Sequence, residues 1–286
     1  MSSTTSPALP RPLPPGFRYS YVETSQGRMR LVWGGEGRPV LMIHGLGGSA
    51  EDFFDCARLL ASRYLLIIPD MPGFGLSDKP DAPYSLDWFL EVLGELARGL
   101  GLERARWVGH SLGGLLVLAL AARHPGLVER VAAICPAGGQ RKPKWETRLL
   151  GPPLIRSDDR LRLWSPLFIK LFLKHVFSVK DHPAAFELER RVLAQWSGPG
   201  RGLRERSFIR SARTAIRERV WQQVGRIQAP VLLVVGERDR VIPARHTRRI
   251  WHHLPPGASL LNLPCGHMAP YVQAPALARA LDRFLD

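Results

Sequence analysis

A serine flanked by glycines is the residue in this chain with the clearest chemical potential. Ser111 stands in a G-x-S-x-G pattern at 109–113, between an apolar run at 105–108 and a second one at 115–120. This order predicts a strand, a sharp turn and a helix, with Ser111 at the apex of the turn. The small neighbours let the strand and the helix pass closely. The hydroxyl then points out of the sheet at the positive end of a helix.

A serine hydroxyl becomes a good nucleophile only when a base takes its proton. An acid and a histidine are therefore expected further along the chain, in the order Ser, Asp or Glu, His. Asp239 and His267 fit this order, and each follows an apolar run typical of a buried strand. Because the carboxyl ends of parallel strands share one edge of a sheet, we expect these two residues to meet Ser111 there.

Five short motifs together resemble those of the α/β-hydrolase superfamily. The nucleophile, acid and base motifs are similar to residues 109–114 (G-H-S-L-G-G), 236–243 (G-x-x-D-x-x-x-P) and 266–267 (G-H). The oxyanion-loop motif resembles residues 44–48 (H-G-L-G-G), and the family's D-x-P-G-x-G-x-S loop matches residues 70–77. The resemblance runs from about Phe17 to the C-terminus, and no family motif falls between roughly 138 and 228.

The resemblance implies an α/β protein with the α/β-hydrolase fold, a mostly parallel, doubly wound sheet with an inserted helical cap. It implies a core made of residues 17–137 and 229–286, with the cap at 138–228. The cap sequence reads as short, basic, amphipathic helices interrupted by prolines. Residues 1–16 are rich in Pro and Ser and lack an apolar core, so we expect them to be disordered and not a secretory signal.

The same resemblance implies a catalytic triad of Ser111, Asp239 and His267. His267 would remove the proton of Ser111, and Asp239 would orient the imidazole and stabilise its charge. The backbone N–H groups of Leu46 and Leu112 match the family's oxyanion donors. We expect no cofactor, and we expect no metal because His246, His252 and His253 have no carboxylate partner at ligand spacing.

Other polar residues near these motifs have competing interpretations. Glu237 competes with Asp239 as the acid, and the G-x-x-D spacing favours Asp239. Asp70 ends a strand but precedes the serine, so it is expected to order its own glycine-rich loop. His110 is expected to pack beneath the turn at the nucleophile, and His44 to brace the oxyanion loop through hydrogen bonds.

The charge of this chain is strongly positive and uneven. Its formal net charge is +15, and residues 138–221 hold nineteen Lys or Arg against eight Asp or Glu. A nucleic acid, an anionic membrane surface or an acidic substrate could explain this excess, as could a solvated, arginine-rich helical face. No nucleic-acid motif accompanies the charge, so we favour the solvated face and expect no nucleic-acid partner.

Residues 167–177 combine aromatic and apolar side chains with lysines. Phe168 and Phe172 lie near one face of a helix that begins at Leu167, and we expect them to bind substrate as the roof of an acyl pocket over Ser111. Two alternatives stay open: the apolar face docks on a membrane with its lysines toward anionic headgroups, or it only packs on the core.

Length, composition and cysteine usage agree with a globular enzyme. The 286 residues are 45% hydrophobic, and no apolar run approaches the roughly 20 residues of a membrane span. Cys56, Cys135 and Cys265 are odd in number and follow no metal spacing, so we expect reduced, buried thiols and a cytoplasmic location.

The reaction favoured by the resemblance is hydrolysis of a small-molecule ester. Epoxide hydrolases and haloalkane dehalogenases of the superfamily need an aspartate nucleophile, and position 111 is serine. We favour a carboxylesterase or small-acyl lipase acting through an acyl-enzyme. A lactonase, a carbon–carbon bond hydrolase, an aminopeptidase, a cofactor-free haloperoxidase and a slow-turnover ligand receptor remain alternatives. The oligomeric state is left open.

Overall fold

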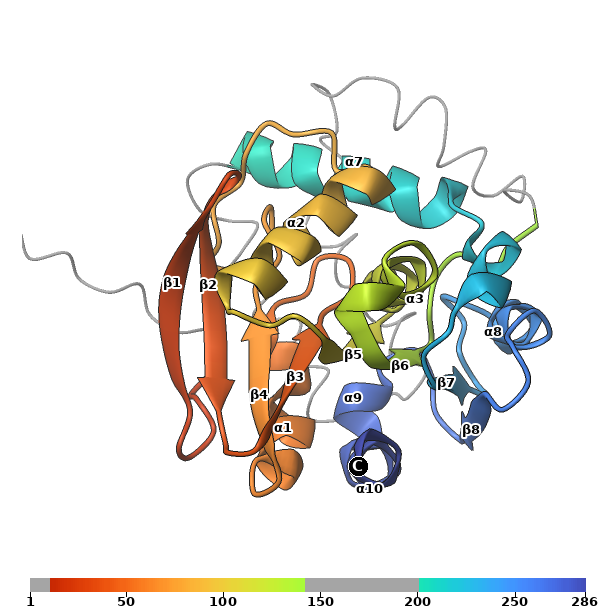
Figure 1. The fold of residues 1–286 in the computed structure, drawn as a ribbon. Coiled ribbons are helices and arrows are strands. Elements are labelled where there is room, and N and C mark those ends of the chain that lie inside the picture. The colour runs from red at the N-terminus through yellow and green to blue at the C-terminus, as the bar shows by residue number, and fades with distance from the viewer. Residues whose placement is uncertain (1–10, 142–200) are drawn as a thin grey trace, which may run out of the picture.

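A single mixed sheet forms the centre of the molecule (Figure 1). The computed structural model describes residues 11–141 and 201–286. Within these residues eight strands are arranged in the order β1-β2-β4-β3-β5-β6-β7-β8. The strands are β1 (Arg18–Thr24), β2 (Gly27–Gly34), β3 (Arg38–Ile43), β4 (Tyr64–Pro69), β5 (Ala105–His110), β6 (Val128–Ile134), β7 (Val231–Gly236) and β8 (Ser259–Leu263).

The pairing of these strands is mostly parallel. The pairs β1–β2 and β2–β4 are antiparallel, and every other neighbouring pair is parallel. The central strands β5 and β7 are buried along their whole length, and β7 is accordingly an apolar run that does not alternate. The expected fold class, a mostly parallel sheet of the α/β-hydrolase type, is confirmed.

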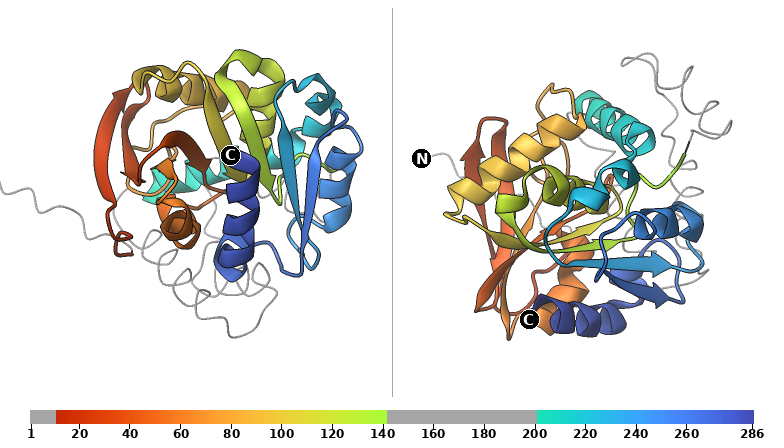
Figure 2. Two further views of the ribbon diagram at one scale, coloured as in Figure 1. Left: turned by 60° about the horizontal axis from the view of Figure 1, so that its bottom comes forward. Right: turned by 45° about the vertical axis from the view of Figure 1, so that its right-hand side comes forward.

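Helices cover both faces of the sheet, as Figure 2 shows. The described α-helices are α1 (Phe54–Leu60), α2 (Leu86–Gly99), α3 (Leu112–Arg123), α7 (Arg201–Arg217), α8 (Ala244–Trp251), α9 (Ala269–Val272) and α10 (Ala274–Leu285). The described 3-10 turns are η1 (Ala50–Phe53), η2 (Pro125–Leu127), η3 (Val220–Gln222) and η4 (Val224–Arg226). None of the helices in the described part of the chain is long and apolar enough to cross a membrane.

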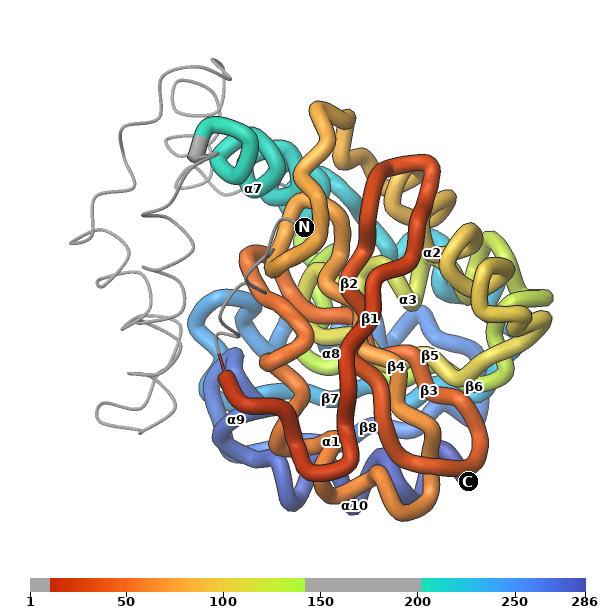
Figure 3. The backbone as a smooth tube through the Cα atoms, turned by 90° about the vertical axis from the view of Figure 1, so that its left-hand side faces the viewer, coloured from red at the N-terminus to blue at the C-terminus, as the bar shows by residue number. Residues whose placement is uncertain are grey.

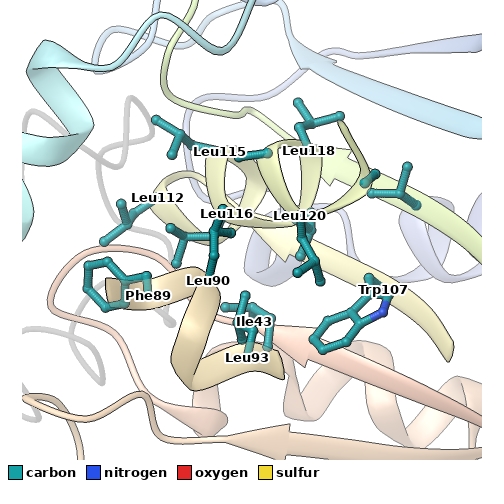
Figure 4. Packing of buried hydrophobic residues seen from close by; sticks show 14 of the residues in the cluster. Ile43, Phe89, Leu90, Leu93, Trp107, Leu112, Leu115, Leu116, Leu118 and Leu120 are labelled. Carbon is teal, nitrogen blue, oxygen red and sulfur yellow. The ribbon is translucent and has the colours of Figure 1, made fainter. Parts of the chain in front are cut away.

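Alternation along β3 divides the core into two layers. Leu41 and Ile43 belong to the layer that contains α2 and α3, whereas Val40 and Met42 belong to the layer that contains α1 and α10. Successive strand side chains point to opposite faces, so one strand supplies both layers. Figure 4 shows Ile43 packed among leucines of α2 and α3 in the first layer.

Helix α2 combines a capped first turn with one apolar face. The Ser85 side chain accepts a hydrogen bond from the backbone N–H of Trp88, which caps the first turn. Phe89, Leu93 and Leu96 are buried on the face toward the sheet, at the spacing expected for an amphipathic helix.

The segment expected to form the cap is described only in part. Phe168 and Phe172 lie outside the described residues, as does everything from 142 to 200. Helix α7 is described, and it is one continuous helix of 17 residues where the sequence suggested short pieces. It lies beside the loop that leads from β4 to α2 (Figure 3), where Thr214 Oγ1 donates to the Tyr84 carbonyl over 2.8 Å.

Residues 11–16 also differ from the sequence expectation. Arg11 forms an ion pair with Asp55 at 2.5 Å, and the Phe17 N–H donates to the Pro14 carbonyl over 3.0 Å. These contacts place the end of the proline-rich stretch against the core. Disorder stays a prediction for residues 1–10, which lie outside the described part of the chain.

Candidate active site

Ser111 sits at a strained turn between β5 and α3. Its backbone adopts φ 55° and ψ −113°, a region that non-glycine residues rarely occupy. A side chain at Gly109 would overlap the backbone of Gly113, and a side chain at Gly113 would overlap the carbonyl oxygen of Ile43. Both glycines are therefore needed for the strand, the turn and the helix to pass so closely.

Ser111, His267 and Asp239 form one hydrogen-bonded row. His267 Nε2 lies 2.9 Å from Ser111 Oγ, and His267 Nδ1 lies 2.7 Å from Asp239 Oδ2. All three residues are at most 9% exposed. An ionised carboxylate can only accept, so Nδ1 donates to Asp239 and Nε2 is left to accept from the serine hydroxyl. This is the tautomer that a general base needs.

Asp239, and not Glu237, meets His267. The other carboxylate oxygen of Asp239 accepts the backbone N–H groups of Val241 and Ile242, each over 2.8 Å. These two bonds fix the orientation of the carboxylate that meets His267. The Glu237 carboxylate is instead paired with Arg248 at 2.6 and 2.8 Å on the surface.

The loop after β3 approaches Ser111. A Cβ placed on Gly45 would lie 3.1 Å from Ser111 Cβ, so the loop backbone passes directly beside the serine. Leu46 follows Gly45, and Leu112 is the first residue of α3, where a backbone N–H has no partner within the helix. The structure thus brings the segments of both expected oxyanion donors to Ser111.

His44 braces this loop, in agreement with the sequence interpretation. Its Nδ1 lies 2.7 Å from the Gly45 carbonyl oxygen and donates to it. Its Nε2 is then free to accept the backbone N–H of Met71 over 3.0 Å. The imidazole therefore ties the oxyanion loop to the loop that begins at Asp70.

His110 lies beneath the turn, as expected, and contacts the backbone of His267. Its Nε2 is 2.9 Å from the backbone oxygen of His267, and the two rings are 4.9 Å apart. Burial, and next the neighbouring His267, lowers the pKa of His110 from 6.5 to about 4. A neutral ring that donates through Nε2 is consistent with this bond.

Asp70 organises its own loop and also anchors a buried ion pair. Its carboxylate accepts the backbone N–H groups of Ala50 and Leu76, each over 2.7 Å. It also pairs with Arg30 at 3.0 Å, and Arg30 reaches Glu51 at 2.9 Å. No motif or spacing in the sequence pointed to Arg30 or Glu51. Buried and exposed residues do not alternate around Arg30 in β2, because its neighbours along the strand are buried as well. The sequence pattern therefore does not single out Arg30.

The Cys135 thiol lies close to Asp239 and His267. Ligand atoms of Cys135, Asp239 and His267 all fall within 4.8 Å of one another, the one metal-compatible group found among the described residues. Burial, and next the charge of Asp239, raises the pKa of the Cys135 thiol well above its usual value. A protonated thiol is a poor metal ligand, and Asp239 and His267 already bond to each other. The expectation of a metal-free site therefore stands as a prediction.

Helix α7 packs directly on the loops around Ser111. A Cβ on Gly47 of the oxyanion loop would lie 3.1 Å from the ring of Phe208. Ser207 Oγ donates to the Tyr84 hydroxyl over 2.9 Å, and both side chains close over Gly73. The sequence analysis did not select Phe208, because its position over Gly47 depends on how α7 docks.

The profile of the α/β-hydrolase fold family matches residues 38–274. The chain is 38% identical to the 2-hydroxymuconate semialdehyde hydrolase of Pseudomonas sp. (strain CF600), over 90% of each chain. It is 29% identical to Lipase 1 of Psychrobacter immobilis, over 83% of this chain and 73% of that one. It is also similar to a solved bacterial membrane phospholipase A, with a TM-score of 0.78, 26% identity, and coverage of 95% of this chain and 86% of the other.

This chain belongs to the α/β-hydrolase fold family. The family match spans most of the sequence, the relatives include named hydrolases, and the sheet is mostly parallel as expected. The protein is a hydrolase.

Proposed function

We propose that this hydrolase cleaves a carboxylic ester of a small molecule through an acyl-enzyme on Ser111. The observation that carries the proposal is the row of 2.9 Å and 2.7 Å contacts from Ser111 through His267 to Asp239. The similarity to a lipase and to a phospholipase A supports an ester as the substrate.

The proposed mechanism uses the contacts among Ser111, His267 and Asp239. Ser111 Oγ attacks the acyl carbon while its proton passes to His267 Nε2, and Asp239 stabilises the imidazolium through Nδ1. The oxyanion accepts hydrogen bonds from the backbone N–H groups of Leu46 and Leu112. His267 then protonates the departing alkoxide. In the second half of the reaction, His267 takes a proton from water while the water oxygen attacks the acyl carbon of the acyl-enzyme. The carboxylic acid product then leaves, and His267 returns the proton to Ser111 Oγ.

Two measurements test the ester hydrolase proposal. Steady turnover of p-nitrophenyl butyrate, abolished in Ser111→Ala, is the expected result. A fluorophosphonate should label Ser111 in the wild-type protein and leave the variant unlabelled. Labelling that persisted undiminished in Ser111→Ala would place the nucleophile elsewhere. Tight ligand binding with only a single turnover would favour the receptor alternative.

A carbon–carbon bond hydrolase is the second candidate. The observation that favours it is the 38% identity to a 2-hydroxymuconate semialdehyde hydrolase over 90% of each chain. Assaying 2-hydroxymuconate semialdehyde beside p-nitrophenyl esters separates the two. An ester hydrolase should have the higher kcat/KM on an ester, and the reverse ranking would move the assignment to the second candidate.

The acyl pocket is proposed to lie beneath the segment 138–228. Phe168 and Phe172, outside the described residues, were selected from the sequence, and Phe208 adds an aromatic ring at Gly47 of the oxyanion loop. Replacing each of these three with alanine should raise KM for medium-chain esters more than for acetate. Equal effects at all chain lengths, with lost binding to anionic vesicles, would favour a membrane-docking role for the basic segment.

The location proposed for the enzyme is the cytoplasm. Cys56, Cys135 and Cys265 are buried and unpaired, as suits a reducing compartment. Fractionation of the native host, with activity followed in each fraction, tests this part of the proposal.

A further inference from the structure

A buried hydrogen bond joins helix α9, which follows the proposed base His267, to the turn η1, which follows the oxyanion loop. The Tyr271 hydroxyl donates to Asp52 Oδ1 over 2.8 Å, across 219 positions of sequence. Tyr271 is 7% exposed and Asp52 is 3% exposed. Tyr271 belongs to α9, the helix that follows His267, and Asp52 belongs to η1, which follows the oxyanion loop.

The Asp52 end of this bond lies against the turn of the oxyanion loop. A Cβ placed on Gly48 would overlap Asp52 Oδ2, so the carboxylate sits directly on the loop backbone. The Gly48 N–H closes that turn on the Gly45 carbonyl over 3.1 Å, and the Asp52 N–H bonds to Ser49 over 3.0 Å. A shift of the Asp52 carboxylate would therefore move the loop beside Ser111.

The Tyr271 end lies on the short segment that begins at the base. The Tyr271 N–H donates to the Met268 carbonyl over 3.0 Å, which starts α9 directly after His267. His110 holds the backbone oxygen of His267 from β5 at 2.9 Å. The segment from His267 to Tyr271 is thus held at its first residue by His110 and at its last residue by the Tyr271–Asp52 bond.

We propose that Tyr271 and Asp52 are a positioning pair that sets the place of His267 relative to the oxyanion loop. This proposal rests on the proposed function, because it assigns a task within the same site. A misplacement of about 1 Å between reacting groups can lower the rate on the order of 100-fold. Loss of the Tyr271–Asp52 bond is therefore expected to slow the reaction. A carboxylate acceptor also makes this hydrogen bond stronger than a neutral one.

Tyr271→Phe removes only the hydroxyl, and Tyr64→Phe is the matched control. The Tyr64 hydroxyl donates to the Asp282 carbonyl of α10 over 2.9 Å, away from Ser111. Two readouts are compared: the rate at which a fluorophosphonate labels Ser111, and kcat and KM for p-nitrophenyl butyrate. We expect Tyr271→Phe to lower kcat and the labelling rate about tenfold with KM within about twofold, and Tyr64→Phe to change neither.

Two variants of Asp52 and one of Gly48 separate positioning from stability. Asp52→Asn keeps a carbonyl acceptor, so it should retain more activity than Asp52→Ala. Gly48→Ala should displace the Asp52 carboxylate and lower kcat as Tyr271→Phe does. Thermal unfolding of each variant shows whether a loss of rate merely follows a loss of folded protein.

The outcomes separate this proposal from the proposed function. Suppose that the wild-type protein is labelled at Ser111 and that the fluorophosphonate labels Tyr271→Phe as fast as Tyr64→Phe. This result would overturn the positioning pair and leave the hydrolase mechanism in place. A wild-type protein that is not labelled at Ser111 would overturn the mechanism, and the positioning pair with it. If the Asp52 and Gly48 variants fail to fold, the comparison of the two tyrosine variants alone decides.

Discussion

His267 Nδ1 lies 2.7 Å from the Asp239 carboxylate, which is held in place by two backbone N–H groups of its own loop. Glu237, two positions earlier, faces the surface and pairs with Arg248. The short strand-to-helix loop after β7 therefore presents one carboxylate to His267 and the other to solvent.

Asp239→Asn is expected to reduce kcat on the order of 10,000-fold, by analogy with other triads, because an amide no longer holds the productive tautomer of His267. Glu237→Gln removes only an exposed ion pair and should change kcat less than about twofold. Steady-state hydrolysis of p-nitrophenyl butyrate measures both. The reverse ranking would assign the acid role to Glu237.

His110 should make folding stability depend on pH. Burial lowers its pKa from 6.5 to about 4, so the unfolded chain takes up a proton at a higher pH than the folded one. The contribution of neutral His110 to the free energy of unfolding is complete above pH 6.5. It is lost as the pH falls toward 4, and the total loss is roughly 3 kcal/mol. Urea unfolding of the wild type and of His110→Gln between pH 7 and pH 4.5 measures this. Equal pH slopes in both proteins would contradict the assignment.

Arg30 should be far more important for stability than a surface arginine. The side chains of Arg30, Glu51 and Asp70 are fully buried, so Arg30→Met would leave two buried carboxylates without their cation. We expect a loss of about 3–5 kcal/mol in the free energy of unfolding. The control is Arg63→Met, whose partners Asp282 and Asp286 are partly exposed, and whose loss should stay below about 1 kcal/mol. Equal midpoints in urea would show that the buried network contributes no more than the surface pair.

Gly113→Ala should disrupt the turn at the nucleophile. The added methyl group would meet the carbonyl oxygen of Ile43, which belongs to a central strand and cannot move aside. We expect a lower melting temperature and loss of fluorophosphonate labelling at Ser111. Gly126→Ala is the control, since a Cβ there meets nothing within 4 Å. A Gly113→Ala protein that melted and reacted like the control would contradict this account of the turn.

The sequence alone was sufficient for the parts of the site that depend on local geometry. The strained turn at Ser111 needs small residues at 109 and 113, and each of Asp239 and His267 directly follows an apolar strand. In a parallel sheet the carboxyl ends of the strands lie along one edge, so pattern and chain order are enough to expect that the three side chains gather there. The hydrogen-bonded row in the structure agrees with that expectation.

Only the tertiary structure decided the contacts that tie this row to its surroundings. The Arg30 ion pair, the place of Phe208 over Gly47 and the bond between Tyr271 and Asp52 each join segments from different parts of the chain. Neither the hydrophobic periodicity nor the motif spacing of the sequence predicts such a contact, because the contact forms when separate loops and helices pack together. The residues that could perform the chemistry lie in short motifs that the sequence shows. The residues that hold these motifs in position can be identified only from the packing of the whole domain.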